Sequence, residues 1–277
     1  MSVPLWPERS ARMQRTGGTP AIAYATRGTQ GPRVLMVMGL GMRGEMWEPQ
    51  LTLLEPTHRL AYFDHRGIGE SGTPTRRYRI ADLALDACAV ADALGWATFH
   101  LVGVSMGGMV AQELALAAPA RIRSLTLIVT HAGGPLGMVP TAAGALGAVR
   151  SALARDRIGA LEQLLYSADS LEALRARGLR RRLEMQLTGA MTKGARLRQL
   201  WAVARFDTRR RLARLQVPTQ ILKASRDRLV RPSHSELLAR QIPGAELRTF
   251  ERAGHGVIVQ ESDAIAAAIR EHIARHE

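Results

Sequence analysis

The stretch that decides the fold runs Phe99-His100-Leu101-Val102-Gly103-Val104-Ser105-Met106-Gly107-Gly108. Its first six residues are mostly apolar and predict a buried strand, and the apolar spacing from Met106 to Ala118 predicts a helix that stops at Pro119. A turn this sharp between a strand and a helix leaves room only for very small residues two positions before and after its central residue. Glycines occupy both positions, so we expect a strained Ser105 with its hydroxyl exposed above the sheet.

The pattern G-x-S-x-G around Ser105 is rare. With 26 glycines among 277 residues, chance produces about 0.1 such matches in the whole chain, before a strand and a helix are required around it. The alternative interpretation is an ordinary tight turn in which the serine caps the helix. Interpreted as a nucleophile elbow, the turn presents a serine for attack on a carbonyl, with the positive end of the following helix dipole behind it.

A serine hydroxyl needs a base to become a nucleophile, and His255 is the candidate. It lies in the glycine-flanked loop Ala253-Gly254-His255-Gly256, between a predicted strand at Glu246–Phe250 and a predicted closing helix at Val257–Arg275. A loop at the carboxyl end of a strand can bring an imidazole onto the elbow. Of the other downstream histidines, we expect His272 and His276 to face solvent and His234 to open a surface helix.

The base in turn needs an orienting acid, and in this kind of site the chain order is serine, acid, histidine. Asp227 follows the predicted strand Thr219–Ala224 and so lies at its carboxyl tip. The alternative interpretation is an exposed turn aspartate that pairs with Arg226 or Arg228. The tip of the predicted strand Ser124–Thr130 is followed by His131 and has no carboxylate.

Two backbone amides are candidates for stabilising the negative oxygen of a tetrahedral intermediate. The predicted strand Val34–Met38 ends in Gly39-Leu40-Gly41-Met42, a flexible loop that can aim an amide at the elbow. The Leu40 amide, together with the Met106 amide, would form the oxyanion hole.

The segment Gly39–Gly44 also matches G-x-G-x-x-G after a strand, and Asp64 follows Gly44 by 20 residues. This pattern is typical of dinucleotide binding and would indicate an oxidoreductase. Pro49, however, predicts that the next helix begins only near Glu48, too late to receive a pyrophosphate. A strand also precedes this unit, and Asp64 belongs to a glycine-rich tight loop. A nicotinamide enzyme is therefore disfavoured.

Alternating strands and helices predict an α/β fold with a mostly parallel, approximately eight-stranded sheet flanked by helices. The sequence also predicts a helical cap inserted after the sixth strand, because the strand rhythm stops after Gly133-Gly134-Pro135 and resumes only after Pro218. The expected organisation is a core in residues 1–132 and 213–277 with the cap in 133–212. The clear strand patterns are Ala21–Ala25, Val34–Met38, Arg59–Phe63, Phe99–Val104, Ser124–Thr130, Thr219–Ala224 and Glu246–Phe250; the clear helical patterns outside the cap are Met46–Leu54, Ile80–Leu94, Met106–Ala118, Ser233–Gln241 and Val257–Arg275.

These motifs together resemble the α/β-hydrolase superfamily over nearly the whole chain. The matching segments are 64–71 (DHRGIGES), 103–108, 225–230 and 253–257. The resemblance implies a lidded esterase, lactonase, C–C hydrolase or cofactor-free perhydrolase, with no cofactor and no metal. Met38-Gly39 stands where the family often has His-Gly before the oxyanion loop. A serine nucleophile argues against the epoxide hydrolases and dehalogenases of this fold, which use aspartate.

The expected reaction is hydrolysis of a small-to-medium, largely apolar carboxylic ester through an acyl-enzyme on Ser105. The alternatives are lactone or C–C bond hydrolysis, perhydrolysis, or a catalytically slow ligand-binding receptor of the same fold, since pocket shape decides among them. The candidate substrate-pocket residues are Gly39, Met42, Trp47, Met109, His131, Leu136 and Trp201.

The formal net charge is +14, and residues 150–214 hold fifteen arginines and one lysine against six acidic residues. Such a region can bind nucleic acid or anionic membranes, but no nucleic-acid motif and no interleaved aromatic residues accompany it, so a solvated helical face is the favoured interpretation. We expect no nucleic-acid partner, no membrane span, no secretory signal and a cytoplasmic location. The single cysteine, Cys88, is expected in buried packing and excludes an intrachain disulfide. The expected partners are a small-molecule substrate and, as an option, a second copy of the chain.

Overall fold

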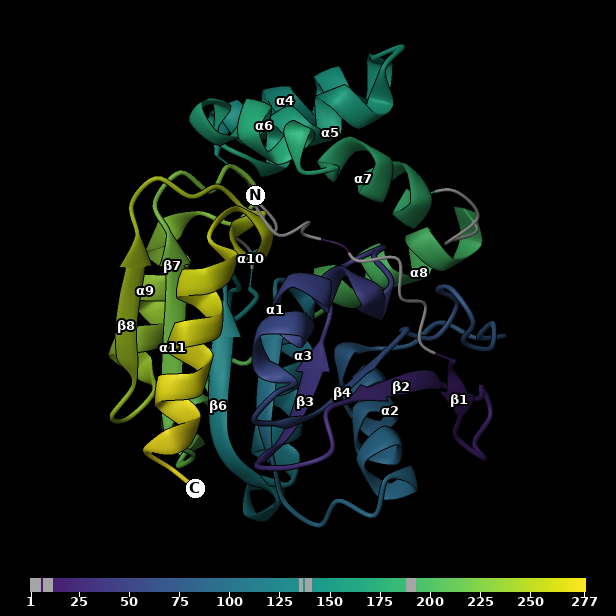
Figure 1. Ribbon diagram of the computed structural model, residues 1–277, viewed down its shortest axis with the longest axis vertical. Helices are drawn as coiled ribbons and strands as arrows, with labels where there is room; N and C mark the ends of the chain where they lie inside the picture. Colours follow the sequence, from purple (N-terminus) through teal and green to yellow (C-terminus); the bar gives the residue numbers. More distant parts are fainter. Residues whose placement is uncertain (1–5, 7–11, 135–136, 138–140, 188–192) are drawn as a thin grey trace.

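The framework of the fold is an eight-stranded sheet with strand order β1-β2-β4-β3-β5-β6-β7-β8 (Figure 1). The computed structural model describes residues 6, 12–134, 137, 141–187 and 193–277. The pairs β1–β2 and β2–β4 are antiparallel and the pairs from β4 to β8 are parallel. The strands are β1 Gln14–Arg15, β2 Ala23–Arg27, β3 Arg33–Val37, β4 Arg59–Phe63, β5 Phe99–Val104, β6 Ile122–Ile128, β7 Thr219–Ala224 and β8 Glu246–Phe250.

The expected mostly parallel sheet is confirmed, with small differences at the strand ends. β1 was not expected, because a two-residue strand leaves no alternating pattern in the sequence. β6 ends at Ile128, before the expected end at Thr130, because Val129 has a positive φ of 42° and leaves the extended conformation. β2 likewise begins later than expected, at Ala23, where it pairs with Arg15 of β1.

Helices cover both faces of the sheet (Figure 1). The helices α2, α3 and α9 pack on one face, and α1, α10 and α11 pack on the other, each face with its own apolar cluster. The core helices are α1 Glu48–Leu54, preceded by the 3₁₀ helix η1 Gly44–Trp47, and α2 Ile80–Ala93, α3 Met106–Ala117, α9 Pro232–Gln241, α10 Val257–Gln260 and α11 Ser262–Ala274. The 3₁₀ helices η2 and η3 are Pro119–Arg121 and Leu212–Arg214.

The closing helix is broken where the sequence predicts one continuous helix over Val257–Arg275. Glu261 has φ −121° and ψ 42°, which ends α10 before α11 begins. Gln50 of α1 lies at this break, and its side-chain amide donates to the Ile258 carbonyl at 2.6 Å. The break therefore lies where α1 packs against the end of the chain.

A helical layer lies over the carboxyl ends of the strands (Figure 1). Between β6 and β7 the described residues form α4 Ala142–Leu153, α5 Arg157–Leu165, α6 Ala168–Ala176, α7 Leu179–Leu187 and α8 Lys193–Ala204. The two ends of this insertion meet, because the Thr208 amide donates to the Ala132 carbonyl at 2.8 Å and Gly133 forms a bridge with Asp207. The expected helical insertion after the sixth strand is therefore confirmed.

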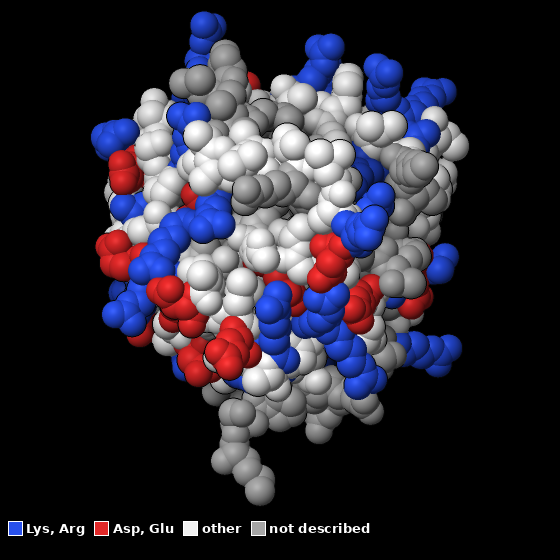
Figure 2. All heavy atoms as spheres, turned by 90° about the horizontal axis from the view of Figure 1, so that it is seen from above, with Lys and Arg blue, Asp and Glu red and all other residues white. Residues whose placement is uncertain are grey.

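The basic side chains of the upper face are interspersed with acidic ones (Figure 2). Arg180 pairs with Asp156 at 2.7 Å and Arg226 pairs with Asp169 at 2.6 Å. Exposed pairs of this kind contribute little to stability, but they interrupt the positive charge. No helix among the described residues is long and apolar enough to span a membrane.

Cys88 packs against the apolar cluster on its face of the sheet, but it is only partly buried, less than the sequence predicts. It is partly exposed on α2, and its Sγ accepts a hydrogen bond from Arg121 Nη1 at 2.8 Å. The apolar spacing of α2 does not show whether Cys88 lies at the centre of the buried face or at its edge.

Candidate active site

Ser105 lies on a strained turn between β5 and α3. Its φ of 55° and ψ of −121° are outside the regions that ordinary residues adopt, as the sequence predicts. The Ser105 amide donates to the Ile128 carbonyl at 2.9 Å, and Thr130 Oγ1 donates to the Ser105 carbonyl at 2.7 Å. The neighbouring strand β6 and its continuation thus hold the turn from one side.

The two glycines of the motif are required by crowding. A Cβ on Gly103 would lie 2.3 Å from the Gly107 carbonyl oxygen, and a Cβ on Gly107 would lie 2.0 Å from the Val37 carbonyl oxygen. Real Cβ atoms do not approach a carbonyl this closely, so no larger residue fits at either position. The backbone can therefore bring β3, β5 and α3 together only if both positions are glycine.

The structure brings Ser105, His255 and Asp227 together from three separate segments. His255 Nε2 lies 3.0 Å from Ser105 Oγ, and His255 Nδ1 lies 2.7 Å from Asp227 Oδ2. Asp227 is buried, and the His255 side chain is 11% exposed. A carboxylate that accepts the proton of Nδ1 leaves Nε2 with its lone pair toward the serine hydroxyl. The arrangement can therefore remove a proton from Ser105.

Asp227 uses its two oxygens for different purposes. Oδ2 contacts the imidazole, while Oδ1 accepts the amides of Leu229 and Val230 at 2.8 and 2.9 Å. These local bonds fix the turn that follows β7. The turn itself therefore orients the carboxylate so that Oδ2 points toward His255.

The loop that carries His255 is held by the insertion. Gly256 donates its amide to the Leu165 carbonyl at the end of α5, at 2.8 Å. A Cβ on Gly256 would lie 2.2 Å from the Tyr166 ring, so the glycine allows Tyr166 to pack directly against the loop. Gln260 Oε1 accepts the Gly254 amide at 3.1 Å. These contacts fix the loop on both sides of the histidine.

The loop after β3 approaches Ser105 closely. A Cβ on Gly39 would lie 3.3 Å from the Ser105 Cβ and 3.8 Å from its Oγ. Leu40 follows in this loop, and Met106 is the first residue of α3, where helix amides have no intrahelical acceptor. Within the described part of the chain, neither the Leu40 nor the Met106 amide donates to a backbone carbonyl. Both stay candidates for the oxyanion hole.

His131 lies just after β6 and is buried and held neutral. Burial lowers the pKa of His131 to about 4, and the nearby His234 and His255 act in the same direction. Its Nδ1 accepts the Gly133 amide at 2.9 Å, so in the neutral ring the proton is on Nε2. Its ring contacts those of Phe206 and His234, at centroid distances of 6.3 and 5.5 Å.

The other candidate pocket residues are placed in different surroundings. Trp47 is fully buried in the cluster beneath α1, and Met109 is buried on α3. Met42 is half-buried and packs against the same apolar cluster as Trp47. Trp201 lies on α8, and the guanidinium groups of Arg77 and Arg205 lie 5.7 and 5.1 Å from its ring centroid. Leu136 lies outside the described residues.

His272 is buried, so the expectation that it faces solvent is wrong. It follows Ile265 and Ile269 at helical spacing, so it continues the apolar stripe of α11 into the core. Its Nε2 lies 3.3 Å from the Pro218 carbonyl oxygen. A late position on an amphipathic helix favours exposure, but the period of the helix places His272 inward.

Asp64, which follows the glycine pattern of residues 39–44, holds two loops through its carboxylate. Oδ1 accepts the Gly44 amide at 2.8 Å and Oδ2 accepts the Glu70 amide at 3.1 Å. A Cβ on Gly69 would lie 2.0 Å from Oδ2, so this glycine lets the backbone wrap the carboxylate. The helix α1 begins at Glu48, too late to receive a pyrophosphate at these glycines.

Two glutamines without a motif signal in the sequence reach the loop after β3. Gln199 of α8 accepts the Gly41 amide at 2.9 Å, and Gln186 of α7 accepts the Arg43 amide at 3.0 Å. Both are buried. An isolated glutamine in an arginine-rich helix has no periodic or motif signal, so the sequence offered no means of finding them.

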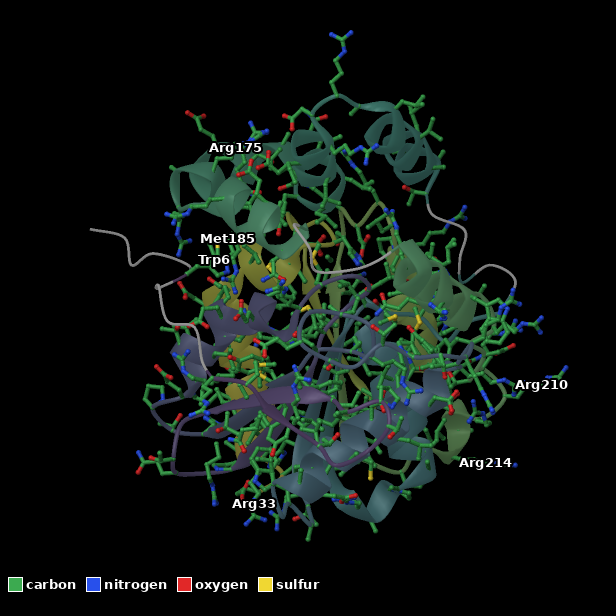
Figure 3. All side chains as sticks on the ribbon, turned by 90° about the vertical axis from the view of Figure 1, so that its right-hand side faces the viewer. Trp6, Arg33, Arg175, Met185, Arg210 and Arg214 are labelled. Atoms are coloured by element: carbon green, nitrogen blue, oxygen red, sulfur yellow. The ribbon has the colours of Figure 1, made fainter. Side chains whose placement is uncertain are left out.

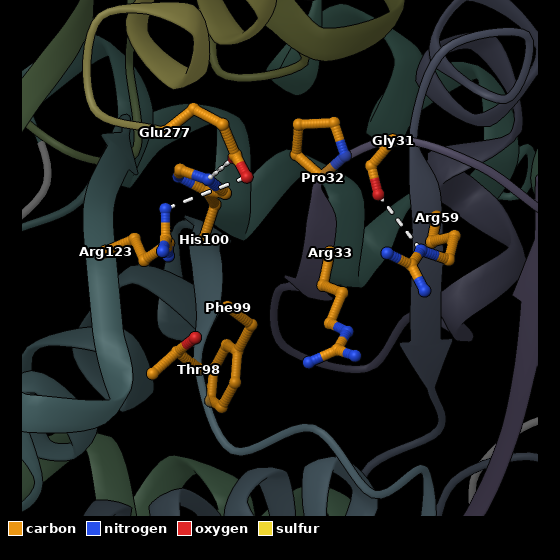
Figure 4. A pocket seen from close by; sticks show the side chains of 9 residues that line it. All are labelled: Gly31, Pro32, Arg33, Arg59, Thr98, Phe99, His100, Arg123 and Glu277. Atoms are coloured by element: carbon orange, nitrogen blue, oxygen red, sulfur yellow. Dashed lines mark hydrogen bonds and ion pairs between the residues drawn. The ribbon is translucent and has the colours of Figure 1, made fainter.

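Two cavities lie away from Ser105. One, of about 140 Å³, lies at the amino ends of the strands and is lined by Arg33, Arg59, Arg123 and other residues (Figure 4). Arg33 lies at the end of the molecule opposite Arg175 of the insertion (Figure 3). The other, of about 230 Å³, is lined by Arg66, Tyr78 and neighbouring residues. Neither cavity contains Ser105, Asp227 or His255.

Within the described ranges, no group of three or more His, Cys, Asp or Glu side chains is arranged to hold a metal ion.

A strained serine at the carboxyl edge of a parallel sheet, followed in the chain by an acid and a histidine that meet it, defines the class of α/β hydrolases. The model of the alpha/beta hydrolase fold family matches residues 32–262. The chain therefore belongs to the alpha/beta hydrolase fold family, and it is an enzyme of the hydrolase class.

Several known proteins are similar over nearly the whole chain. A protein named putative carbamate hydrolase RutD, from Azorhizobium caulinodans, is 31% identical over 249 residues, which cover 86% of this chain and 89% of the relative. The crystal structure of a hydrolase from Pseudomonas aeruginosa has a TM-score of 0.80 at 29% identity and covers 96% of this chain and 99% of that one. An enol-lactonase from Burkholderia xenovorans has a TM-score of 0.79 at 23% identity and covers 95% of this chain and 100% of that one, a likeness of fold.

Proposed function

We propose that the chain is a serine hydrolase that cleaves small-to-medium, largely apolar carboxylic esters through an acyl-enzyme on Ser105. The observation that carries the proposal is the continuous contact from Asp227 Oδ2 through the His255 ring to Ser105 Oγ, at 2.7 and 3.0 Å. A serine becomes a nucleophile when a histidine accepts its proton and a carboxylate orients that histidine.

In the acylation step, Ser105 Oγ forms a bond to the ester carbonyl carbon while His255 Nε2 takes the hydroxyl proton. The amides of Leu40 and Met106 donate to the oxyanion as the carbonyl oxygen gains charge. His255 then gives its proton to the alkoxy oxygen as the C–O bond breaks, and the alcohol leaves. Asp227 stabilises the imidazolium throughout and keeps the ring in its orientation.

In the deacylation step, water takes the place of the alcohol. His255 accepts a proton from the water as its oxygen attacks the acyl carbon, and returns that proton to Ser105 as the acyl bond breaks. One ester and one water thus yield one acid and one alcohol, and Ser105 is restored.

We further propose that residues 133–212 act as a cap on a core formed by residues 1–132 and 213–277. The support is the position of α4–α8 over the carboxyl ends of the strands and the contact of Leu165 and Tyr166 with the histidine loop. Three of the candidate pocket residues have relations to the triad that support this proposal. A Cβ on Gly39 would lie 3.3 Å from the Ser105 Cβ, the Met109 amide donates to the Ser105 carbonyl at 3.4 Å, and His255 lies close enough to His131 to influence its pKa.

The same triad has alternative reactions, which are hydrolysis of a lactone, a carbamate or a C–C bond, and formation of a peracid. The name of the RutD relative is a reason to test a carbamate as a substrate. The name of the enol-lactonase shows that a protein of this fold acts on a lactone. A ligand receptor without turnover is the alternative in a different class.

The test is the rate of hydrolysis of p-nitrophenyl esters of graded acyl length and bulk, with a lactone and a carbamate added to the panel. We expect the highest kcat/KM with an ester, and we expect Ser105→Ala to reduce kcat by at least about 10³-fold with the fold intact. The matched control is Ser233→Ala, because Ser233 is exposed on α9.

The possible outcomes separate the candidates. A preference for the carbamate or lactone would replace the ester while keeping the triad. Undiminished turnover in Ser105→Ala would remove the nucleophile, and tight binding of the esters without turnover by the wild type would favour the receptor.

A further inference from the structure

The loop after β3 is tied to the insertion by a buried side chain far away in the sequence. Gln199 of α8 is fully buried, and its Oε1 accepts the amide of Gly41 at 2.9 Å, across 158 positions of the chain. Gly41 directly follows Leu40 and has a φ of 74°. The Gly41 N–H and the Leu40 carbonyl belong to one planar peptide group. The bond to Gln199 therefore restrains the orientation of that group and of the Leu40 backbone next to it.

The orientation of the Gln199 amide is decided by this bond. Of the two polar atoms of the glutamine side chain, only the oxygen can accept a hydrogen bond, so Oε1 faces the Gly41 amide and Nε2 faces away. Nε2 is buried and has no partner within the described part of the chain. An unpartnered buried donor costs free energy, so this side chain is poorly suited to stabilising the fold. Its acceptor, directed at the loop, is the feature that distinguishes it from an apolar residue of the same size.

The loop is held from the core side and from the insertion side. On the core side, His65 Nε2 lies 2.8 Å from the Met38 carbonyl oxygen. On the other side, Gln199 of α8 and Gln186 of α7 accept the amides of Gly41 and Arg43. In Figure 1, α8 lies lower than α4–α6, beside the core. The helix is thus placed to hold this loop.

We infer that Gln199 is a positioning residue that fixes the oxyanion loop, so that the Leu40 amide meets the negative oxygen in the transition state. The inference rests on the proposed function, because it assigns a geometry to the same site. An oxyanion donor acts mainly on the transition state, so its misplacement lowers kcat more than it raises KM. The substrate itself need not touch Gln199.

The test compares Gln199→Met and Gln199→Glu with the wild type. Methionine keeps the length and apolar volume and removes the acceptor, whereas glutamate keeps an oxygen that can accept the Gly41 amide. We expect Gln199→Met to lower kcat on a p-nitrophenyl ester by about 10- to 100-fold, with KM changed less than about 3-fold. We expect Gln199→Glu to recover a large part of that loss.

A readout independent of turnover is the rate at which a fluorophosphonate labels Ser105. Its phosphoryl oxygen gains charge in the same place, so the labelling rate of Gln199→Met should fall in parallel with kcat. The matched control is Gln220→Met, a buried glutamine in β7 that donates to Thr126 Oγ1 and the Ala268 carbonyl and lies away from the loop. We expect this control to change thermal stability but neither rate.

The outcomes distinguish this inference from the proposed function. If the wild type neither turns over esters nor labels at Ser105, the proposed function fails. If the wild type does both and Gln199→Met matches it in both rates, the inference fails while the function stands. Equal losses in Gln199→Met and Gln220→Met, each with a lowered melting temperature, would reduce Gln199 to a structural residue and overturn the inference.

Discussion

Single atoms carry the chemistry of this protein, and Asp227 illustrates how. Its Oδ1 is occupied by the amides of Leu229 and Val230, so only Oδ2 is left for His255. The local turn thereby fixes the carboxylate, the carboxylate fixes the imidazole tautomer, and the tautomer decides whether Ser105 can lose its proton. An error at the first step would be transmitted to the last.

Asp227→Asn separates the local role of this residue from its role toward His255. The amide oxygen can still accept the bonds of Leu229 and Val230, but an NH₂ group then faces Nδ1 and favours the wrong tautomer. We expect kcat to fall by about 10⁴-fold with little change in the unfolding transition. Ester turnover and urea unfolding measure the two effects. The control is Asp169→Asn, an exposed aspartate paired with Arg226, and an equal loss of activity there would contradict the assignment.

At the scale of elements, the site depends on how closely β3, β5 and α3 approach. Gly103 and Gly107 lie where side chains would overlap backbone atoms of the neighbouring segments. The insertion adds a second set of contacts, since α5 packs on the histidine loop and α8 holds the loop after β3. The catalytic segments are thus fixed from the core below and from the helices above.

Gly107→Ala tests the close approach of these elements. Its Cβ would lie 2.0 Å from the Val37 carbonyl oxygen, a backbone atom that cannot move away without displacing β3. We expect a loss of more than about 4 kcal/mol in the free energy of unfolding, or failure to fold. Gly95→Ala is the matched control, because Gly95 has a φ of 66° but nothing within 4 Å, and should cost only about 1–2 kcal/mol. Similar unfolding free energies for the two variants would contradict the steric argument.

Across the whole molecule, buried histidines link stability to pH. Burial lowers the pKa values of His65, His131 and His272 to about 4, and it lowers those of His58 and His100 as well. In the unfolded chain an imidazole takes up a proton below about pH 6.5, but in the folded protein His65, His131 and His272 stay neutral until about pH 4. Protonation in this window therefore favours the unfolded state.

We expect the free energy of unfolding to fall as the pH is lowered from about 6.5 to 4, by up to about 1.4 kcal/mol per pH unit for each such histidine. Burial raises the pKa values of Glu48, Asp64 and Asp86, and these groups act in the opposite direction toward the acid end of the range. Urea unfolding at several pH values measures the slope. His272→Gln keeps a donor for the Pro218 carbonyl and removes the titration, so its slope should be shallower; an unchanged slope would show that His272 is not held neutral.

Much of the candidate site was predictable because its signals are local. The glycine spacing around Ser105 reflects crowding within a few residues, and the positions of Asp227 and His255 follow from lying just after strands whose carboxyl ends meet at one edge of a parallel sheet. The late start of α1 followed from Pro49 in the same way. Local sterics and strand order together were sufficient to place all three residues near one another.

Other features had no local signal. A late position on an amphipathic helix predicts exposure for His272, and a mid-helix position predicts burial for Cys88. His272 is buried and Cys88 is only partly buried, because burial depends on which face of each helix meets the sheet. Trp47, a candidate for the pocket, is enclosed in the core instead. Burial at the margin of a helix stripe is decided by the packing partner, which the sequence of that helix does not specify.

By itself, the sequence determined the order of strands and helices, the strained serine turn and the residues that accompany it, because short-range sterics and hydrophobic periodicity are written in neighbouring residues. Only the tertiary structure decided that Gln199 meets Gly41, that Asp227 divides its oxygens between a turn and an imidazole, and that α5 packs against the histidine loop. The physical reason is that these are directional contacts between single polar groups distant in the chain. Such contacts form only after the apolar faces have packed and have fixed the distance and orientation of the segments that carry them.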